Sequence, residues 1–283
     1  MKIGRDALQA AVRRACELDV QALKPGNVSV DSPAYGMTAV DFIASANAIA
    51  EPITRPGLDV GERIYHAIAA TQRAVNCNTN LGIVLLLAPI VRAAEFATEN
   101  GVSLEQNLND VLNHLTLADA EWAYRAIRLA KAGGMGRISD HDISQAPKVT
   151  LLQAMQGAAE RDQIARLYAT GYDALLSEAL PVWREAYQKW RSANWATTAV
   201  FLDRLATTPD SLIARKFGRE VSVAVTVAAK PLWQTLRSAC YPDTLRAPLI
   251  AWDAELKDKG LNPGTTADIS VATVFFASLQ DGY

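Results

Sequence analysis

The residues best suited to chemistry in this sequence are acids near expected helix starts. Each follows a Ser, Thr or Asp at a fixed spacing, in the pairs Thr38–Asp41, Asp59–Glu62, Thr116–Asp119, Ser139–Asp142 and Thr265–Asp268. This spacing is typical of a capping box, in which two side chains satisfy unpaired backbone N–H groups of the first helical turn. Alternatively, several of these helix starts meet at one end of a bundle, where their carboxylates hold a magnesium ion that bridges phosphate oxygens. The spacing leaves both interpretations open.

Two basic positions are candidates for contact with phosphate. Lys24 stands beside a rigid Pro-Gly turn in the stretch Lys24–Asn27, which could direct its ammonium group into a cleft. Arg215 and Lys216 form a second basic pair, which either meets phosphates or lies on a helix surface. The glycine-rich stretch Gly133–Arg137 follows an expected helix and is more typical of a helix C-cap than of a phosphate loop. The sequence contains neither a P-loop nor a dinucleotide-binding fingerprint.

The Asn76–Gly82 stretch is the least ordinary part of the chain. It places three asparagines and a threonine directly before a very apolar segment, which is more than one helix N-cap requires. A cap with an Asx turn would explain part of this pattern. We favour a polar site at the mouth of a buried helix, where these side chains hydrogen-bond the sugar or base of a ligand.

The elements that must position these residues are predicted to be helices. Apolar residues recur at helical spacing along most of the chain, whereas alternating strand-like runs are scarce. The Leu81–Val91 run is too short to span a membrane and predicts a buried core helix. The longest expected loop covers Lys24–Met37. Further helices are expected over Leu104–Leu115, Leu117–Ala132, Leu151–Leu176, Val182–Arg191, Thr197–Ala206, from Ser211 onward, and over Ala267–Leu279. We therefore predict an all-α fold, with residues 1–283 in one compact domain around a buried central helix.

Two local predictions depend on this helical assignment. Val221–Ala229 prefers strand by composition, yet we predict helix because a single strand cannot form a sheet. Asp162 falls on the apolar face of the helix expected over Leu151–Leu176, so it should point inward and need a partner. Arg161 and Arg166 are the candidates for that partner.

Composition limits the classes of function. The chain has 283 residues, is 50% hydrophobic, and carries a formal net charge of -2, which argues against nucleic-acid binding through bulk charge. Its three cysteines lie far apart, and its N-terminus reads as an amphipathic helix rather than a signal peptide, so we expect a cytoplasmic protein without a membrane partner. Trp183, Trp190 and Trp195 form either a homodimer face or part of the core, and we favour the core.

Taken in order, these stretches resemble the triphosphoribosyl-dephospho-CoA synthase family over nearly the whole chain. The residues that carry the resemblance are Lys24–Asn27, Asp41 and Phe42, Gly61 and Glu62, Thr71, Asn78–Asn80 with Gly82, and Asn262–Asp268. The last stretch reads N-P-G-T-T-A-D and is the most specific. The resemblance implies an all-helical transferase that uses ATP as a ribosyl donor: the 2'-hydroxyl of dephospho-CoA attacks C1' of the ATP ribose, adenine leaves, and the triphosphate stays attached.

The resemblance also implies roles for individual residues. Lys24 and Arg215 would contact phosphates, and Asn78, Thr79 and Asn80 would contact ribose. Asp41, Glu62 and Asp268 would hold Mg²⁺ or act as the catalytic base. The remaining nucleotide-binding positions are expected at the matching motif residues, which are Gly26, Asn27, Asn262 and Gly264.

The chain also departs from the family pattern. Where citrate-lyase-associated members read N-T-H-K-G, this chain has Asn80 and Leu81, so an imidazole and an ammonium are absent. It is similar to a divergent branch linked to one-carbon cofactor synthesis. Two alternatives therefore stay open: an enzyme that acts on a phosphorylated intermediate of a methanopterin- or methanofuran-type cofactor, and a non-catalytic nucleotide- or phosphate-binding protein.

Overall fold

The computed structural model of the protein describes residues 3–96, 102–130 and 144–282, and within these ranges the fold is all-α, with no β-strand. The α-helices are α1 (Arg5–Gln21), α2 (Ala39–Ile53), α3 (Val60–Val75), α4 (Leu81–Phe96), α5 (Leu104–Asn113), α6 (Leu117–Leu129), α7 (Leu151–Ala158), α8 (Gln163–Ala169), α9 (Leu180–Trp190), α10 (Ala193–Thr207), α11 (Ser211–Phe217), α12 (Arg219–Ser238), α13 (Arg246–Asp258) and α14 (Gly264–Asp281). A π-helical turn covers Ala174–Ala179, and a 3₁₀ turn covers Pro242–Leu245. The predicted fold class is confirmed.

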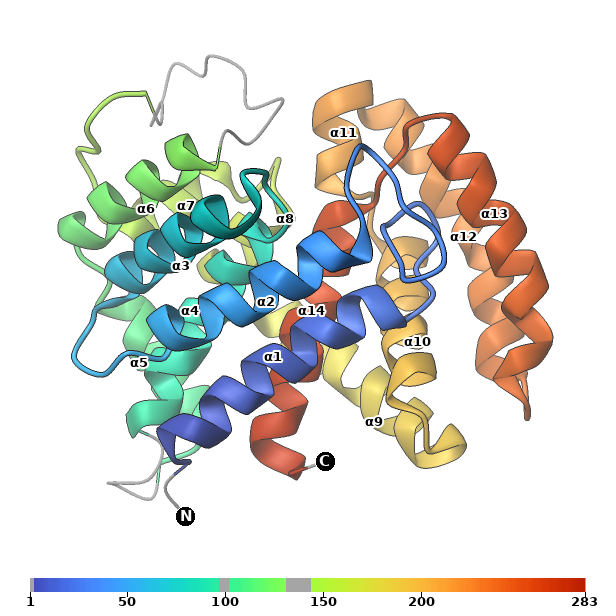
Figure 1. Ribbon diagram of the computed structural model, residues 1–283, viewed down its shortest axis with the longest axis horizontal. Helices are drawn as coiled ribbons and strands as arrows, with labels where there is room; N and C mark the ends of the chain where they lie inside the picture. The colour runs from blue at the N-terminus through green and yellow to red at the C-terminus, as the bar shows by residue number, and fades with distance from the viewer. Residues whose placement is uncertain (1–2, 97–101, 131–143, 283) are drawn as a thin grey trace.

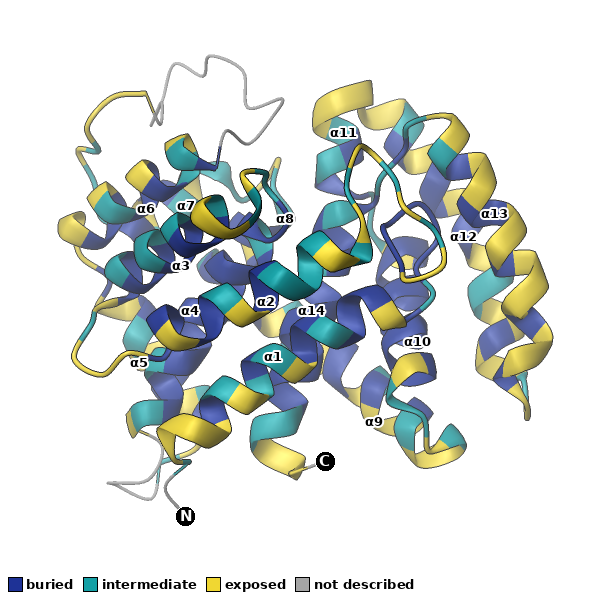
Figure 2. Cartoon of the chain, viewed as in Figure 1, coloured by how far each residue is buried: buried dark blue, intermediate teal, exposed yellow. Residues whose placement is uncertain are grey.

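Two apolar helices from distant parts of the chain form the centre of the domain. Helices α4 and α14 pack against each other, and α1 and α2 cross in front of them in the view of Figure 1. Helices α3, α5 and α6 lie on one side, and α9, α10 and α12 lie on the other (Figure 1). Burial is nearly complete along both central helices, whereas the outer faces of α12 and α13 are largely exposed (Figure 2). The predicted buried helix at Leu81–Val91 is confirmed as α4.

A proline inside the central helix is compensated by a distant tyrosine. Pro89 has no N–H group, so the carbonyl of Leu85 loses its normal helical donor. The hydroxyl of Tyr168 donates to that carbonyl at 2.5 Å, and the hydroxyl of Tyr172 donates to Leu86 O at 3.0 Å. Both tyrosines are almost fully buried. Helix α8 and the turn that follows it are thereby tied to the core helix that begins at the Asn78–Asn80 stretch.

The local helix predictions had mixed outcomes. Val221–Ala229 is helical, within α12, as predicted. The single helix predicted over Leu151–Leu176 was wrong, because the chain leaves the helical conformation at Asp162, which has φ −135° and ψ 124°. Asp162 is the N-cap of α8, and its Oδ1 accepts from Ala165 N at 3.0 Å. Its nearest cation is Arg215, at 3.6 Å between Oδ2 and Nη1, rather than Arg161 or Arg166.

The long loop between α1 and α2 is held in place by the other end of the chain. Gly26 adopts φ +82°, and a β-carbon there would lie 2.6 Å from Leu261 O, so only glycine fits this turn. Its N–H donates to Asp253 Oδ1 of α13 at 2.8 Å.

Trp183 and Trp195 are buried within the chain, which confirms the core interpretation for these two residues. The Gly133–Arg137 stretch and the Ser139–Asp142 pair lie outside the described residues.

Candidate functional site

A cavity of about 870 Å³ lies where the beginnings of four helices meet. The starts of α4, α8, α11 and α14 all contribute lining residues, so segments far apart in the sequence share one site. Helices α4 and α14 are long and begin at the cavity, so their N-terminal dipoles favour negative charge there. Sequence-predicted site residues that line it are Asn27, Asn78, Thr79, Asn80, Arg215, Asn262, Gly264 and Asp268.

Asp268 is the most exceptional group in this cavity. It lies in the second turn of α14, is half-buried, and has no hydrogen-bond or ion-pair partner among the described residues. Burial, followed by the carboxylates of Asp19 and Asp210, raises the pKa of Asp268 well above its ordinary value, and the nearby Lys24 ammonium offsets part of this rise. A carboxyl group without a protein partner in such a setting is suited to exchange a proton with a ligand.

The Asn78–Asn80 stretch forms the wall beside Asp268. The Oδ1 atom of Asn80 accepts from Thr71 Oγ1 at 3.0 Å, while its Nδ2 is buried and has no partner in the described structure. Asn80 lines the cavity and is only 4% exposed, and its orphan donor is shielded from bulk water. Thr79 Oγ1 donates to Ser45 Oγ at 2.6 Å, and Asn78 Oδ1 accepts from Leu81 N at 3.2 Å. The asparagine-rich stretch therefore caps α4 and also leaves an amide donor unused.

Lys24 lies behind the cavity wall rather than in the cavity. Its Nζ donates to Asp19 Oδ1 at 2.5 Å and to Asn27 Oδ1 at 2.9 Å, and Lys24 and Asp19 are 1% and 2% exposed. Asn27 Nδ2 in turn donates to Asn262 Oδ1 at 3.0 Å. Asp19, Asn27 and Asn262 line the cavity, whereas Lys24 does not. Lys24, which the sequence predicts to contact phosphate, is thus held in an ion pair with Asp19.

Four exposed arginines line the cavity. Arg161 and Arg166 come from the segment around the start of α8, and Arg215 and Arg219 come from α11 and α12. Arg161 Nη1 donates to Gly157 O, and Arg166 Nε donates to Ala159 O, both at 3.0 Å. All four side chains belong to exposed residues, so they can bind an anion without first leaving a buried position. A separate apolar wall is formed by Tyr124, Ile127, Leu151, Ala154 and Met155.

These features can be compared with known proteins. A family model described as CitG, ATP:dephospho-CoA triphosphoribosyl transferase, matches residues 5–283. The chain belongs to the CitG family. A crystal structure from Archaeoglobus fulgidus, provisionally described as a triphosphoribosyl-dephospho-CoA synthase, is 23% identical and superposes with a TM-score of 0.62. That match covers 84% of this chain and 96% of the other, and it shows a shared fold. No curated protein matches significantly.

Membership of the CitG family makes this chain a transferase, and ATP is a substrate of the family. The resemblance seen in the sequence is therefore confirmed at the level of the family. The position that carries histidine in the N-T-H-K-G pattern is occupied here by Asn80, which lines the cavity. Leu81, at the position of the lysine, is buried at the start of α4. None of the described helices is long and apolar enough to cross a membrane.

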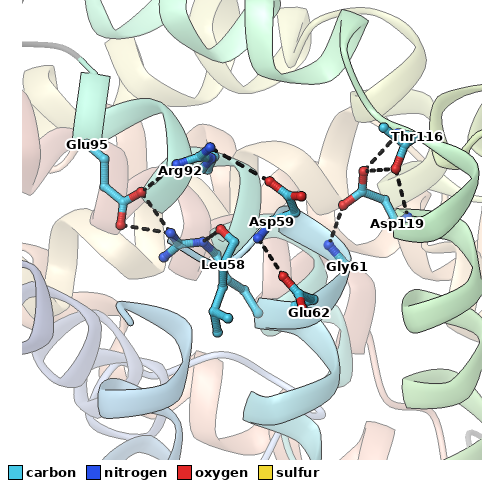
Figure 3. Close-up of polar contacts among 9 residues, drawn as sticks. Leu58, Asp59, Gly61, Glu62, Arg92, Glu95, Thr116 and Asp119 are labelled. Carbon is cyan, nitrogen blue, oxygen red and sulfur yellow. Dashed lines mark hydrogen bonds and ion pairs between the residues drawn. The ribbon is translucent and has the colours of Figure 1, made fainter. Parts of the chain in front are cut away.

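Two of the acids predicted for this CitG-family site lie elsewhere. Asp41 Oδ2 accepts from Thr38 N at 2.7 Å, and Glu62 Oε2 accepts from Asp59 N at 3.0 Å, so each closes a capping box (Figure 3 shows the second). Neither residue lines the cavity. Across the described ranges, no group of three or more His, Cys, Asp or Glu residues is arranged to hold a metal. The structure therefore does not bring Asp41, Glu62 and Asp268 together.

The surroundings of Glu62 explain its place in the fold. Gly61 packs against the backbone of Asp119 in α6, and its N–H donates to Asp119 Oδ1 at 2.8 Å (Figure 3). Arg63 is buried and forms a bidentate ion pair with Glu95 of α4 at 2.7–2.8 Å. This part of the family pattern thus joins α3 to α6 and α4.

The pair Thr265–Asp268 does not form the capping box that its spacing predicts. Helix α14 begins at Gly264, and its first turn is capped from outside by Asp210, whose Oδ2 accepts from Thr266 N at 2.7 Å. The other oxygen of Asp210 accepts from Leu212 N and Ile213 N in α11. Burial raises the pKa of Asp210, although these donors oppose the rise. One buried carboxylate thereby fixes the starts of two helices at the cavity and leaves Asp268 free of capping.

Proposed function

We propose that this CitG-family transferase moves the triphosphoribosyl group of ATP to dephospho-CoA and releases adenine. The observation that carries the proposal is the division of the cavity into two chemical regions. Its lining includes four exposed arginines, while the unpartnered Asp268 carboxylate and the orphan Asn80 amide lie at the start of α4. A nucleoside triphosphate has the same division, with charge at one end and a neutral nucleoside at the other.

In the proposed reaction, the 2'-hydroxyl oxygen of dephospho-CoA forms a bond to C1' of the ATP ribose as the C1'–N9 bond breaks. The electron pair of the broken bond goes to adenine, which takes up a proton and leaves as the neutral base. Asp268 accepts the proton of the attacking hydroxyl, and its negative charge also stabilises the positive charge that develops on the ribose ring. Its raised pKa supports this role, because a more basic carboxylate accepts a proton more readily near neutral pH.

The four lining arginines are proposed to hold the triphosphate. Arg215 and Arg219 come from α11 and α12, and Arg161 and Arg166 come from the α7–α8 segment. Guanidinium groups bind phosphate oxygens in bidentate fashion, which would fix the ribose relative to Asp268. Because the triphosphate remains on the transferred group, these contacts persist from substrate to product.

A magnesium ion fits this arrangement only as an ion held mainly by the substrate. Mg²⁺ commonly takes one or two protein carboxylates together with phosphate oxygens and waters. Asp268 could supply one such oxygen, whereas Asp19 is engaged by Lys24 and Asp210 by backbone donors. When bound, the ion would neutralise phosphate charge. The proton transfer from the hydroxyl is assigned to Asp268 itself.

The test is incubation of the purified protein with ATP, Mg²⁺ and dephospho-CoA, with free adenine and the mass of the coenzyme product followed together. Stoichiometric adenine release, with the coenzyme gaining a triphosphoribosyl group, is the expected result. Asp268→Asn is the matched control, because it keeps the size of the side chain and removes its basicity. If the wild type releases no adenine, the proposal is wrong.

One observation supports a second candidate function. Asn80 and Leu81 replace the histidine and lysine of the citrate-lyase-associated pattern, which changes the proton and charge chemistry of the site. A family member altered in this way could act on a phosphorylated intermediate of one-carbon cofactor synthesis. Binding of ATP without adenine release in the assay above would favour this candidate.

A further inference from the structure

Lys24 determines which amide atoms of Asn27 and Asn262 donate hydrogen bonds and which accept them. An ammonium group can only donate hydrogen bonds, so the Asn27 atom at 2.9 Å from Nζ must be the amide oxygen. The other end of the Asn27 amide is then the NH₂ group, and its partner in Asn262 must be the oxygen. It follows that Asn262 keeps its own Nδ2 for the cavity. No described residue accepts a hydrogen bond from that atom.

A second set of contacts makes Thr79 a hydrogen-bond acceptor toward the cavity. Ser45 Oγ donates to the backbone carbonyl of Asp41 at 2.6 Å, so it must accept from Thr79 Oγ1. The hydroxyl hydrogen of Thr79 is therefore used, and only its lone pairs remain available. Asp268 likewise offers only acceptor atoms when ionised. The cavity lining thus includes a free donor on Asn262 and acceptors on Thr79 and Asp268.

This mixture of donors and acceptors selects one kind of ligand group. A phosphate oxygen accepts only, and it would be repelled by the carboxylates of Asp268 and Asp19. A hydroxyl both donates and accepts, so it can satisfy an amide donor and a carboxylate acceptor at the same time. A ribose carries two adjacent hydroxyls and matches this wall, whereas the triphosphate matches the arginines.

We propose that Lys24 is a positioning residue that orients Asn262, through Asn27, to donate to a ribose hydroxyl of the bound nucleotide. This inference rests on the proposed function, since it requires a nucleotide in the cavity. Lys24 itself touches no ligand. A buried Lys–Asp pair is costly to desolvate, and the orientation of the amides gives that pair a purpose beyond stability.

The experiment measures how strongly the protein distinguishes ribose from deoxyribose. Binding of ATP and of its 2'-deoxy and 3'-deoxy analogues is titrated by calorimetry, and dephospho-CoA and its deoxy analogues are titrated separately, which shows whose ribose is bound. The ratio of dissociation constants is the readout, because both members of each pair carry the same phosphates. We expect at least one deoxy analogue to bind roughly three- to tenfold more weakly to the wild type. Asn262→Leu should bring that ratio close to one.

A matched pair of variants isolates Lys24. In Asp19→Asn, Lys24 can still donate to Asn27, so the ratio should remain. The double variant Asp19→Asn/Lys24→Met removes the ammonium group that donates to Asn27 and leaves no buried charge unpaired. The ratio of dissociation constants should then fall as in Asn262→Leu. Thermal melts confirm that each variant is folded. Gln163→Glu adds a negative charge to the cavity lining, should weaken all nucleotides equally, and should leave the ratio unchanged.

Three results would overturn the inference: a wild-type ratio near one for every analogue, a ratio unchanged in Asn262→Leu, or a ratio unchanged in the double variant. Each is independent of catalysis. If adenine is released but the ratio is unaffected by these changes, only the positioning role fails. If the ratio behaves as expected but no adenine is released, only the proposed transfer reaction fails. If neither ATP nor dephospho-CoA binds, both the positioning role and the proposed transfer reaction fail.

Discussion

The carboxylate of Asp268 lies directly over the α-carbon of Gly82. A β-carbon on Gly82 would overlap Asp268 Oδ2 and would lie only 2.6 Å from its Cγ. Two motifs separated by most of the chain therefore meet at one point, where α4 and α14 begin. The glycine is required here for the close approach of a side chain, and its contact is with the proposed base of the reaction.

Gly82→Ala should therefore impair catalysis more than stability. The added methyl group forces the carboxylate away from its position, and a displacement of about 1 Å at a reacting group commonly costs about a hundredfold in rate. We expect kcat/KM for adenine release to fall by about that factor, with the protein still folded. Gly4→Ala is the control, because a methyl group there meets no atom within 4 Å. Full activity of Gly82→Ala would show that the position of Asp268 is not critical.

Asp268→Asn should separate binding from chemistry. The amide fills the same space but cannot accept the proton of the attacking hydroxyl, so adenine release should fall by about 10²- to 10⁴-fold. ATP affinity should change little, because the arginines are untouched. Single-turnover adenine release and calorimetric ATP binding, measured on the same preparation, check this prediction. Equal losses in both would instead indicate that Asp268 serves binding.

The pH dependence of stability should show the raised pKa of Asp268. Because burial and the carboxylates of Asp19 and Asp210 raise this pKa, the folded state keeps the proton to higher pH than the unfolded state does. Unfolding then releases a proton above the ordinary pKa, so this residue's contribution to stability falls as pH rises. Asp268→Asn should therefore gain stability relative to the wild type as the pH rises above the ordinary pKa of a carboxyl group, in chelator-treated buffer without nucleotide. A difference in Tm that does not vary with pH would contradict the raised pKa.

The motifs of the site could be predicted from the sequence, but the contacts of their charged residues could not. The Lys24–Asn27, Asn78–Gly82 and Asn262–Asp268 stretches were all expected near the ligand, and residues of each line the cavity. The partner of Lys24 was not expected. Asp19 is five residues away, a spacing with no helical meaning, and the two side chains meet only because α1 ends at Gln21.

The acids illustrate a second limit of local patterns. The spacing that closes a capping box at Asp41 and Glu62 is also found at Asp268, yet only Asp268 faces the cavity. What distinguishes Asp268 is that a distant residue, Asp210, supplies the cap of α14. The break at Asp162 was missed for a similar reason, because the apolar pattern continues across the α7–α8 turn.

Arg219→Ala should weaken nucleotide binding without changing the chemical step. Arg219 lines the cavity and is exposed, and it forms no ion pair within the described structure. Loss of one charged contact to phosphate should raise KM for ATP by about tenfold, with kcat nearly unchanged, and the effect should shrink at high salt. Lys230→Ala, on an exposed part of the same helix outside the cavity lining, should leave KM unchanged. An equal effect of both variants would point to overall charge instead of a specific contact.

Tyr168→Phe should destabilise the domain by about 1–3 kcal/mol, because it leaves the buried carbonyl of Leu85 without any donor. Pro89 already removes the helical donor of that carbonyl, so nothing in α4 can replace the tyrosine hydroxyl. Tyr172→Phe is the matched control: its acceptor, Leu86 O, keeps the helical N–H of Ile90, so the loss should be smaller, about 0.5–1.5 kcal/mol. Urea denaturation of both variants measures the difference. Equal losses would mean that the carbonyl freed by the proline has found another donor, and that the tyrosines matter through packing alone.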